Sequence, residues 1–113
     1  IPSNLSNIGI GFFVQKTIAS TSLKYILLTN KDTNTDLTQI AVTQLKAGEV
    51  AEEHLHPTME EFFLFQKGDA MMTVGKEQIA CSSGDFISIP TNTLHALKAI
   101  TDIEIITIGC AVH

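Results

Sequence analysis

Short apolar and β-branched runs, separated by polar turn residues, recur along the chain. Five of them have the length of a strand: Leu37–Leu45, Phe62–Phe65, Met71–Val74, Phe86–Ile89 and Ile103–Ile108. The stretch from Gly11 to Leu28 is ambiguous and fits two more strands. Runs of this kind, spaced roughly 8–12 residues apart with Gly, Asn, Asp or Pro between them, are typical of an antiparallel sandwich or barrel. The pattern predicts one all-β domain over residues 1–113.

The segment HLHPTMEEFF, residues 54–63, admits two interpretations. Thr58, three residues before Glu61, fits the capping box that begins a helix. However, the bulky residues that follow leave a helix no apolar stripe of period 3.6, and polar residues end it within two turns. As a strand, the same residues place Glu61, Phe63 and Phe65 on one face. We therefore predict a strand.

His54 and His56 share one face of such a strand, about 6.6 Å apart at roughly 3.3 Å per residue. Pro57 favours a bend after them, so the chain can return alongside and bring Glu61 near the pair. Two imidazoles and one carboxylate suit a divalent transition metal. On these residues alone, two inward histidines satisfied by hydrogen bonds in the core are an equal alternative.

Composition narrows the classes of function. The chain has 113 residues, a net charge of −5, seven lysines and no arginine. This charge disfavours nucleic acid as a partner, because binding to phosphates requires clustered basic residues. Without a guanidinium group, an anionic substrate would have to be held by lysine, backbone amides or a metal. No signal peptide and no membrane-spanning run is recognisable, so we expect a cytoplasmic location.

A second segment, Gly84 to His95, predicts a turn, a strand, another turn and a histidine that opens the next strand. With it, the chain resembles the cupin family. The first cupin motif is a glycine, five residues, His-x-His, four residues, Glu, six residues and a glycine. Residues 48–68 match every one of its places: Gly48, His54, His56, Glu61 and Gly68.

The second cupin motif is a glycine, five residues, Pro-x-Gly, two residues, His, three residues and Asn. Over residues 84–99 the glycine, proline and histidine match as Gly84, Pro90 and His95. Asn92 stands in place of the second glycine, and Asn tolerates the left-handed backbone that such a turn requires. Ala99 stands in place of the final Asn, which puts a supporting polar contact in doubt but removes no metal ligand.

The resemblance implies a single cupin domain, an antiparallel jelly-roll β-barrel with a metal inside it. The implied ligands are His54, His56, Glu61 and His95. Three neutral imidazoles and one carboxylate leave a divalent ion a net charge near +1 and, in an octahedral site, two open positions, which are typical of catalytic centres. Fe, Mn, Ni, Zn and Cu all accept such ligands.

Three apolar side chains are expected beside the metal. Phe63 and Phe65 share the face of Glu61, and Leu97 shares that of His95, so they would either line a pocket or simply fill the core. Tyr25 and Gln44 would serve as acid or orienting groups only if their strands turn them inward.

The resemblance favours a metal-dependent enzyme acting on a small molecule: a dioxygenase, a lyase or an isomerase. Phosphosugar isomerisation is disfavoured because no arginine is present to hold a phosphate. Two alternatives stay open: a module that binds or senses a small ligand without turnover, and a barrel whose metal only stabilises it. A homodimer is expected, because sheet edges can pair between subunits.

Overall fold

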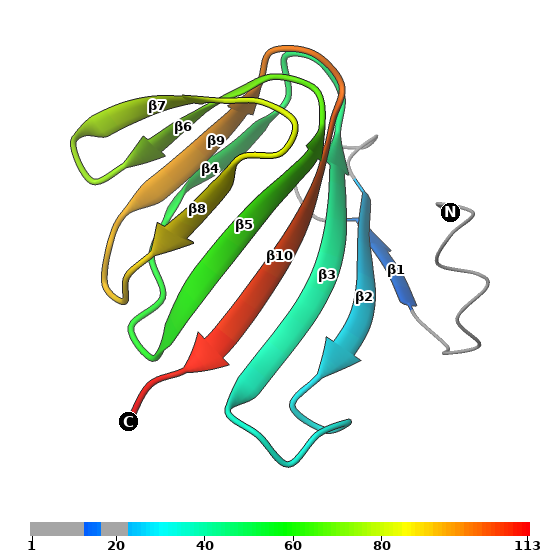
Figure 1. Cartoon of the computed structure of the whole chain (residues 1–113), viewed down its shortest axis with the longest axis vertical. Helices are drawn as coiled ribbons and strands as arrows, with labels where there is room; N and C mark the ends of the chain where they lie inside the picture. Colours follow the sequence, from blue (N-terminus) through cyan, green and yellow to red (C-terminus); the bar gives the residue numbers. More distant parts are fainter. Residues whose placement is uncertain (1–12, 17–22) are drawn as a thin grey trace.

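The computed structural model describes residues 13–16 and 23–113, which form ten strands and no helix (Figure 1). Within that part of the chain, therefore, no helix is long and apolar enough to cross a membrane. The strands are β1 (Phe13–Lys16), β2 (Leu23–Thr29), β3 (Leu37–Leu45), β4 (Val50–His54), β5 (Met59–Lys67), β6 (Ala70–Val74), β7 (Glu77–Cys81), β8 (Phe86–Ile89), β9 (His95–Ala99) and β10 (Ile103–Ala111).

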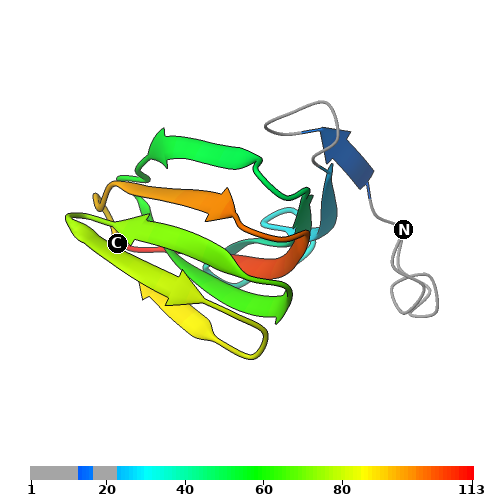
Figure 2. The same cartoon turned by 90° about the horizontal axis from the view of Figure 1, so that it is seen from above.

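The strands form two antiparallel sheets that face each other as layers (Figure 2). The larger sheet has the order β1-β2-β3-β10-β5-β8, and the smaller one β4-β9-β6-β7. The prediction of an all-β, antiparallel fold is confirmed. The expected barrel is not closed, because no strand pairing among the described residues joins one sheet to the other.

The core lies between the two layers, where inward side chains of both sheets meet. On β5 and β10 the buried residues alternate with more exposed ones, as the two-residue period of a strand requires. The largest fully buried apolar side chains are Leu45, Phe65, Met72, Ile89 and Ile105. Burial of a side chain of this size stabilises the fold by about 1.5–3 kcal/mol.

The observed strands follow the predicted runs closely. β3 and β8 have the predicted bounds, while β5, β6 and β10 are longer than predicted. The ambiguous stretch contributes β1 and β2, and the rest of it, apart from these two strands, lies outside the described residues. β7 had no counterpart in the prediction. Its sequence, EQIAC, has two polar residues followed by three apolar ones and so does not alternate between apolar and polar.

Candidate metal centre

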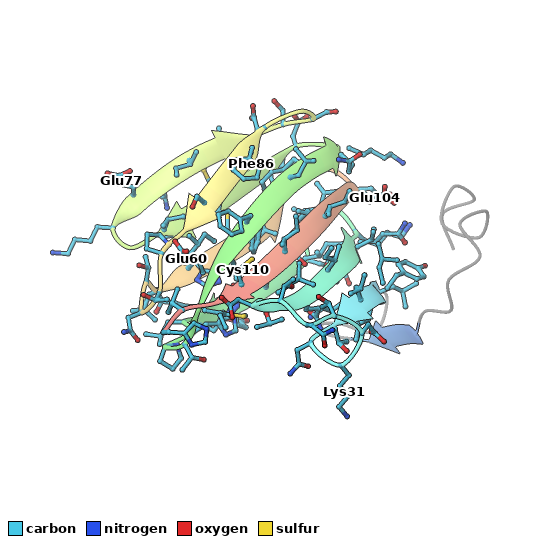
Figure 3. The ribbon with its side chains drawn as sticks, turned by 60° about the horizontal axis from the view of Figure 1, so that its bottom comes forward. Lys31, Glu60, Glu77, Phe86, Glu104 and Cys110 are labelled. Atoms are coloured by element: carbon cyan, nitrogen blue, oxygen red, sulfur yellow. The ribbon has the colours of Figure 1, made fainter. Side chains whose placement is uncertain are left out.

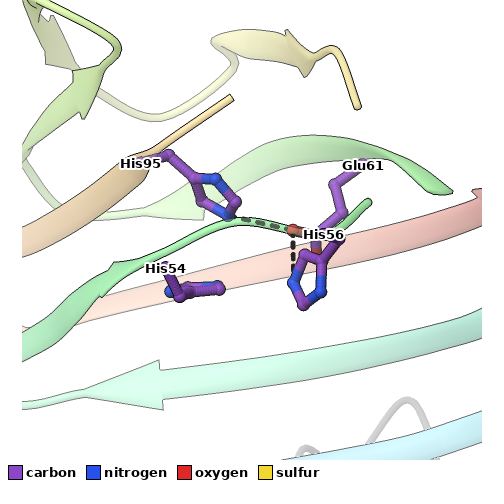
Figure 4. A group of neighbouring side chains, drawn as sticks. All are labelled: His54, His56, Glu61 and His95. Atoms are coloured by element: carbon purple, nitrogen blue, oxygen red, sulfur yellow. Dashed lines mark ion pairs between the residues drawn. The ribbon is translucent and has the colours of Figure 1, made fainter. Parts of the chain in front are cut away.

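Four side chains converge at one point between the sheets (Figure 4). His54 is the last residue of β4 and lies opposite His95, the first residue of β9. Glu61 comes from β5, and His56 from the loop between β4 and β5. One imidazole nitrogen or carboxylate oxygen of each residue lies within 4.8 Å of those of the other three. The structure thus brings together the four residues that the motifs point to.

A β-bulge in β4 turns His54 toward the site. β4 pairs with β9 so that Ala51 faces Leu97 and His54 faces His95, which sets one extra residue of β4 against β9. The extra residue lets both Ala51 and His54 face the space between the sheets, since a bulge redirects the side chains that follow it. The predicted strand through both histidines is therefore wrong at His56, because β4 ends at His54.

The turn at Asn92 positions the loop that carries His56. Asn92 has a positive φ of 57°, the left-handed conformation that was predicted for it. Its backbone amide donates a hydrogen bond of 2.9 Å to the carbonyl oxygen of His56. The turn of the second motif therefore fixes the backbone of a histidine in the first motif.

Hydrogen bonds to the backbone define which nitrogen of two histidines is free. The Nδ1 atom of His54 lies 2.8 Å from the carbonyl oxygen of Glu52, and that of His95 lies 2.9 Å from the carbonyl oxygen of Thr93. Because a carbonyl oxygen only accepts, each Nδ1 carries the hydrogen. In the neutral ring the lone pair is then on Nε2, the atom that would bind a metal.

Glu61 is surrounded by imidazoles. Its Oε1 atom lies 3.0 Å from Nε2 of His95 and 3.1 Å from Nε2 of His56 (Figure 4). The side chain of Glu61 is 14% exposed and that of His95 only 2%. Oε1 of Glu61 and Nε2 of His95 are both buried, and neither has a hydrogen-bond partner at these positions. Two buried lone pairs that face each other require a cation or a proton between them.

The pKa directions of these groups agree with that requirement. Burial alone would raise the pKa of Glu61, but His95, His56 and His54 outweigh it and hold the pKa below its ordinary value. Burial would lower the pKa of His95, but the Glu61 carboxylate and the Thr93 carbonyl outweigh it and raise the pKa. In the metal-free protein both directions favour a proton between His95 and Glu61. A metal ion would take the place of that proton.

The donor set and its dimensions fit a divalent transition metal. Metal bonds of roughly 2.0–2.2 Å to nitrogen and oxygen place two ligand atoms at most about 4.4 Å apart. The four ligand atoms here lie within 4.8 Å of one another, so the side chains would need to move little to bind one ion. Burial lowers the pKa of His56, which favours the neutral imidazole that binds metals. The four residues are therefore able to hold one ion.

The sequence profile of the cupin domain matches residues 41–109. The chain belongs to the cupin family. No curated protein matches it in sequence.

Solved structures resemble this cupin over nearly the whole chain. A predicted oxalate decarboxylase from Thermotoga maritima is 14% identical, with a TM-score of 0.82 and coverage of 93% of this chain and 96% of that one. KdgF from Halomonas sp. is 18% identical, with a TM-score of 0.76 and coverage of 95% and 93%. An RmlC-like cupin from Shewanella frigidimarina is 14% identical, with a TM-score of 0.74 and coverage of 95% and 88%. At these identities the likeness concerns the fold, and it confirms the jelly-roll prediction.

A cavity of about 480 Å³ lies between the sheets of the cupin fold, next to the four-residue group. His54 and Glu61 line it, and so do two of the three apolar residues expected beside the metal, Phe63 and Leu97. Phe65 is fully buried in the core and is not among the residues that line the cavity. The remaining lining residues are Lys24, Thr43, Leu45, Ala51, Glu52, Glu53, Ile105 and Thr107.

Polar residues that the sequence did not single out lie on the cavity wall. Lys24, Thr43 and Thr107 come from β2, β3 and β10, and Lys24 lies opposite Thr43 in the strand register. By contrast, Tyr25 and Gln44 face outward, where the Tyr25 hydroxyl donates a hydrogen bond of 3.3 Å to the side-chain oxygen of Gln44. Neither is therefore available as an acid or orienting group in the cavity. The inward position of Lys24 could have been found from alternation along β2. Leu23, Tyr25 and Leu27 pack together on the outer face of the larger sheet, so Lys24, between the first two, must face inward.

Proposed function

We propose that this cupin is a metal-dependent enzyme that acts on a small organic molecule. The observation that carries the proposal is that His54 and Glu61 belong both to the four-residue group and to the wall of the 480 Å³ cavity. A molecule in the cavity would therefore be next to a metal held by these residues. A cavity of this size, mostly apolar with a few polar groups, is typical of a small-molecule site.

The residues of the chain supply position, charge and exclusion of water. A divalent ion held by His54, His56, Glu61 and His95 would supply Lewis acidity or oxygen activation. The carbonyl groups of Glu52 and Thr93 hold two of the imidazoles in one orientation. The apolar side chains of the wall would exclude water from the part of a ligand that they contact, which would strengthen electrostatic interactions there. This arrangement supports a dioxygenase, a lyase or an isomerase as the class of enzyme.

A second candidate function is binding of a small ligand without turnover. It is favoured by the shortage of proton-transfer groups: apart from the metal ligands, the titratable side chains among the described residues that line the cavity are Lys24, Glu52 and Glu53. Both glutamates are exposed. Tight stoichiometric binding of a ligand that is never converted, with every candidate metal, would favour this second function over the first.

The metal content of the purified protein tests the proposed function. Protein prepared without chelators or a metal-affinity tag is expected to contain close to one transition-metal ion per chain, measured by inductively coupled plasma mass spectrometry. His54→Ala is expected to lose most of it, since a ligand is removed. His113→Ala is the matched control, because His113 is exposed, pairs with Asp36 at 2.8 Å and does not belong to the four-residue group.

The identity of the metal then selects the assays. If the metal is iron, the assay to run is oxygen uptake with small organic acids. If it is zinc or nickel, the protein is assayed with lyase and isomerase substrates. A wild-type protein that holds no metal, even after incubation with each of Fe, Mn, Ni, Zn and Cu, would exclude the proposed function.

We also propose that the protein forms a homodimer through the outer face of the larger sheet. Phe62 stacks on Phe86 there, with ring centroids 6.0 Å apart, and the Phe86 side chain at the edge strand β8 is 58% exposed (Figure 3). Exposed apolar patches of this kind mark interaction surfaces. Light scattering is expected to give a dimer for the wild type and for Ile100→Glu, whose exposed side chain lies elsewhere, and a monomer for Phe86→Glu. A wild-type monomer at high concentration would contradict the proposal.

A further inference from the structure

Lys24 is a charged residue on the inner face of β2. It lines the cavity together with Glu61, on the opposite face of the strand from the buried Tyr25. The Lys24 side chain is only partly exposed, and within residues 23–113 its ammonium group forms no hydrogen bond or ion pair. Lysine is rarely buried without a partner, because an unpaired charge away from water is costly.

The surroundings of Lys24 offer it little compensation. Burial lowers the pKa of Lys24, and the negative charge of Glu61 opposes this effect without cancelling it. Thr43, its neighbour in the strand register, contributes a neutral hydroxyl, and Leu45 and Ile105, which line the same cavity, are apolar. The position of Lys24 is therefore explained better by an anion that enters the cavity than by an interaction within the chain.

We propose that the cavity binds a small organic carboxylate, with the Lys24 ammonium holding the carboxylate group while the other end of the ligand reaches the metal centre. This inference rests on the metal site proposed above and names the substrate class of that site. The chain contains no arginine, so lysine is the side chain that offers a full positive charge at neutral pH. The apolar wall formed by Leu45, Phe63, Leu97 and Ile105 matches an apolar body between the two polar ends.

A metal in the site increases the need for such an anion. In the metal-free protein, the Glu61 carboxylate is the negative charge that acts on Lys24. A divalent ion held by Glu61 and three neutral imidazoles has a net charge near +1, so that Lys24 and the centre then repel each other across the cavity. A carboxylate between them interacts favourably with both. Glu52 and Glu53 also line the cavity, but both are exposed, and water and salt screen their charge.

Bifunctional probes separate the role of Lys24 from that of the metal. The probes are alkyl hydroxamic acids that end in a carboxylate, in a series of linker lengths, each paired with the neutral amide of the same length. The hydroxamate binds to zinc(II), with which the full-length protein is loaded, and the tail reports on Lys24. At the best linker length, calorimetry is expected to show about tenfold or more tighter binding of the acid than of the amide, the range of a charge-assisted hydrogen bond.

The preference for the acid tail is expected to fall to about threefold or less in Lys24→Gln and to persist in Lys24→Arg, which retains a positive charge. Lys98→Gln is the matched control, because Lys98 is exposed on β9 and does not line the cavity. Zinc content and circular dichroism of each variant show that the fold and the metal are retained.

The outcomes distinguish the two proposals. If no hydroxamate binds to the zinc-loaded wild type, the metal centre itself is not open to ligands and the proposed function fails. If the hydroxamates bind but acid and amide tails bind equally, or if Lys24→Gln keeps the preference for the acid, the metal centre stands and the role of Lys24 is overturned.

Discussion

Gly68→Ala is expected to destabilise the protein by about 3–5 kcal/mol, a large part of the 5–15 kcal/mol by which domains are usually stable. Gly68 has a φ of +84°, a conformation that residues with a side chain adopt at a cost. In addition, an added Cβ atom would overlap the carbonyl oxygen of Asp102 and lie 2.9 Å from both Ile103 Cγ2 and Thr101 Oγ1. Conformational strain and steric overlap therefore add up at this position.

The neighbours of Gly68 are not free to move away. The backbone amide of Asp69 donates a hydrogen bond of 2.9 Å to the Thr101 hydroxyl, and the Asp69 carbonyl oxygen accepts from the amides of Ile100 and Thr101. The turn between β5 and β6 is thus bound to the turn between β9 and β10. Because the group nearest to the added Cβ is a backbone carbonyl, relief of the overlap would require these hydrogen bonds to break.

Gly48→Ala is the matched control for this prediction. Gly48 has nearly the same φ, +87°, but no atom lies within 4 Å of its added Cβ. Its substitution is expected to cost only the conformational part, about 1–2 kcal/mol. Urea denaturation of both variants in the presence of a metal chelator measures the difference. Equal free energies of unfolding for the two variants would show that the packing against Asp102 contributes nothing.

The strand pattern was predictable where both faces of a strand are defined by side-chain type. β3 and β8 have the predicted bounds because polar turn residues end their apolar runs on both sides. β7 was not predictable, because its sequence EQIAC, two polar residues followed by three apolar ones, lacks the alternation of a strand, and it forms by pairing with β6 at the edge of the smaller sheet. Edge strands of this kind are formed by tertiary pairing rather than by their own sequence pattern.

The residues of the metal centre were predictable, but the backbone that positions them was not. Spacing and residue type single out His54, His56, Glu61 and His95. The bulge that turns His54 inward arises from the register between β4 and β9, two strands far apart in sequence. Lys24 depends on a similar relation: its inward orientation follows from alternation along β2, but its place on the same cavity wall as Glu61 depends on the strand order β2-β3-β10-β5 in the larger sheet.

Glu61→Gln is expected to weaken zinc binding by at least about 100-fold. This is more than the decrease in metal affinity expected when a residue that only orients a ligand is removed. Glu61 is the one anionic member of the four-residue group, and glutamine keeps its shape while removing the charge. In the metal-free protein the substitution is expected to cost little, because the new amide can donate a hydrogen bond to Nε2 of His95, which lies 3.0 Å from Oε1 of Glu61. Stability and metal binding should therefore separate.

Zinc-dependent stabilisation measures this separation. At a free zinc concentration of about 1,000 times the wild-type Kd, the wild type should gain about 4.1 kcal/mol from the metal, while a variant that binds 100-fold more weakly should gain about 1.4 kcal/mol. Glu60→Gln is the matched control, because Glu60 is the preceding residue of β5, lies on the outer face opposite Cys110 and does not belong to the group (Figure 3). The control should gain as much as the wild type. If zinc stabilised Glu61→Gln as strongly as the wild type, the ion would be bound elsewhere, and the convergence of three histidines on this carboxylate would need an explanation other than a metal.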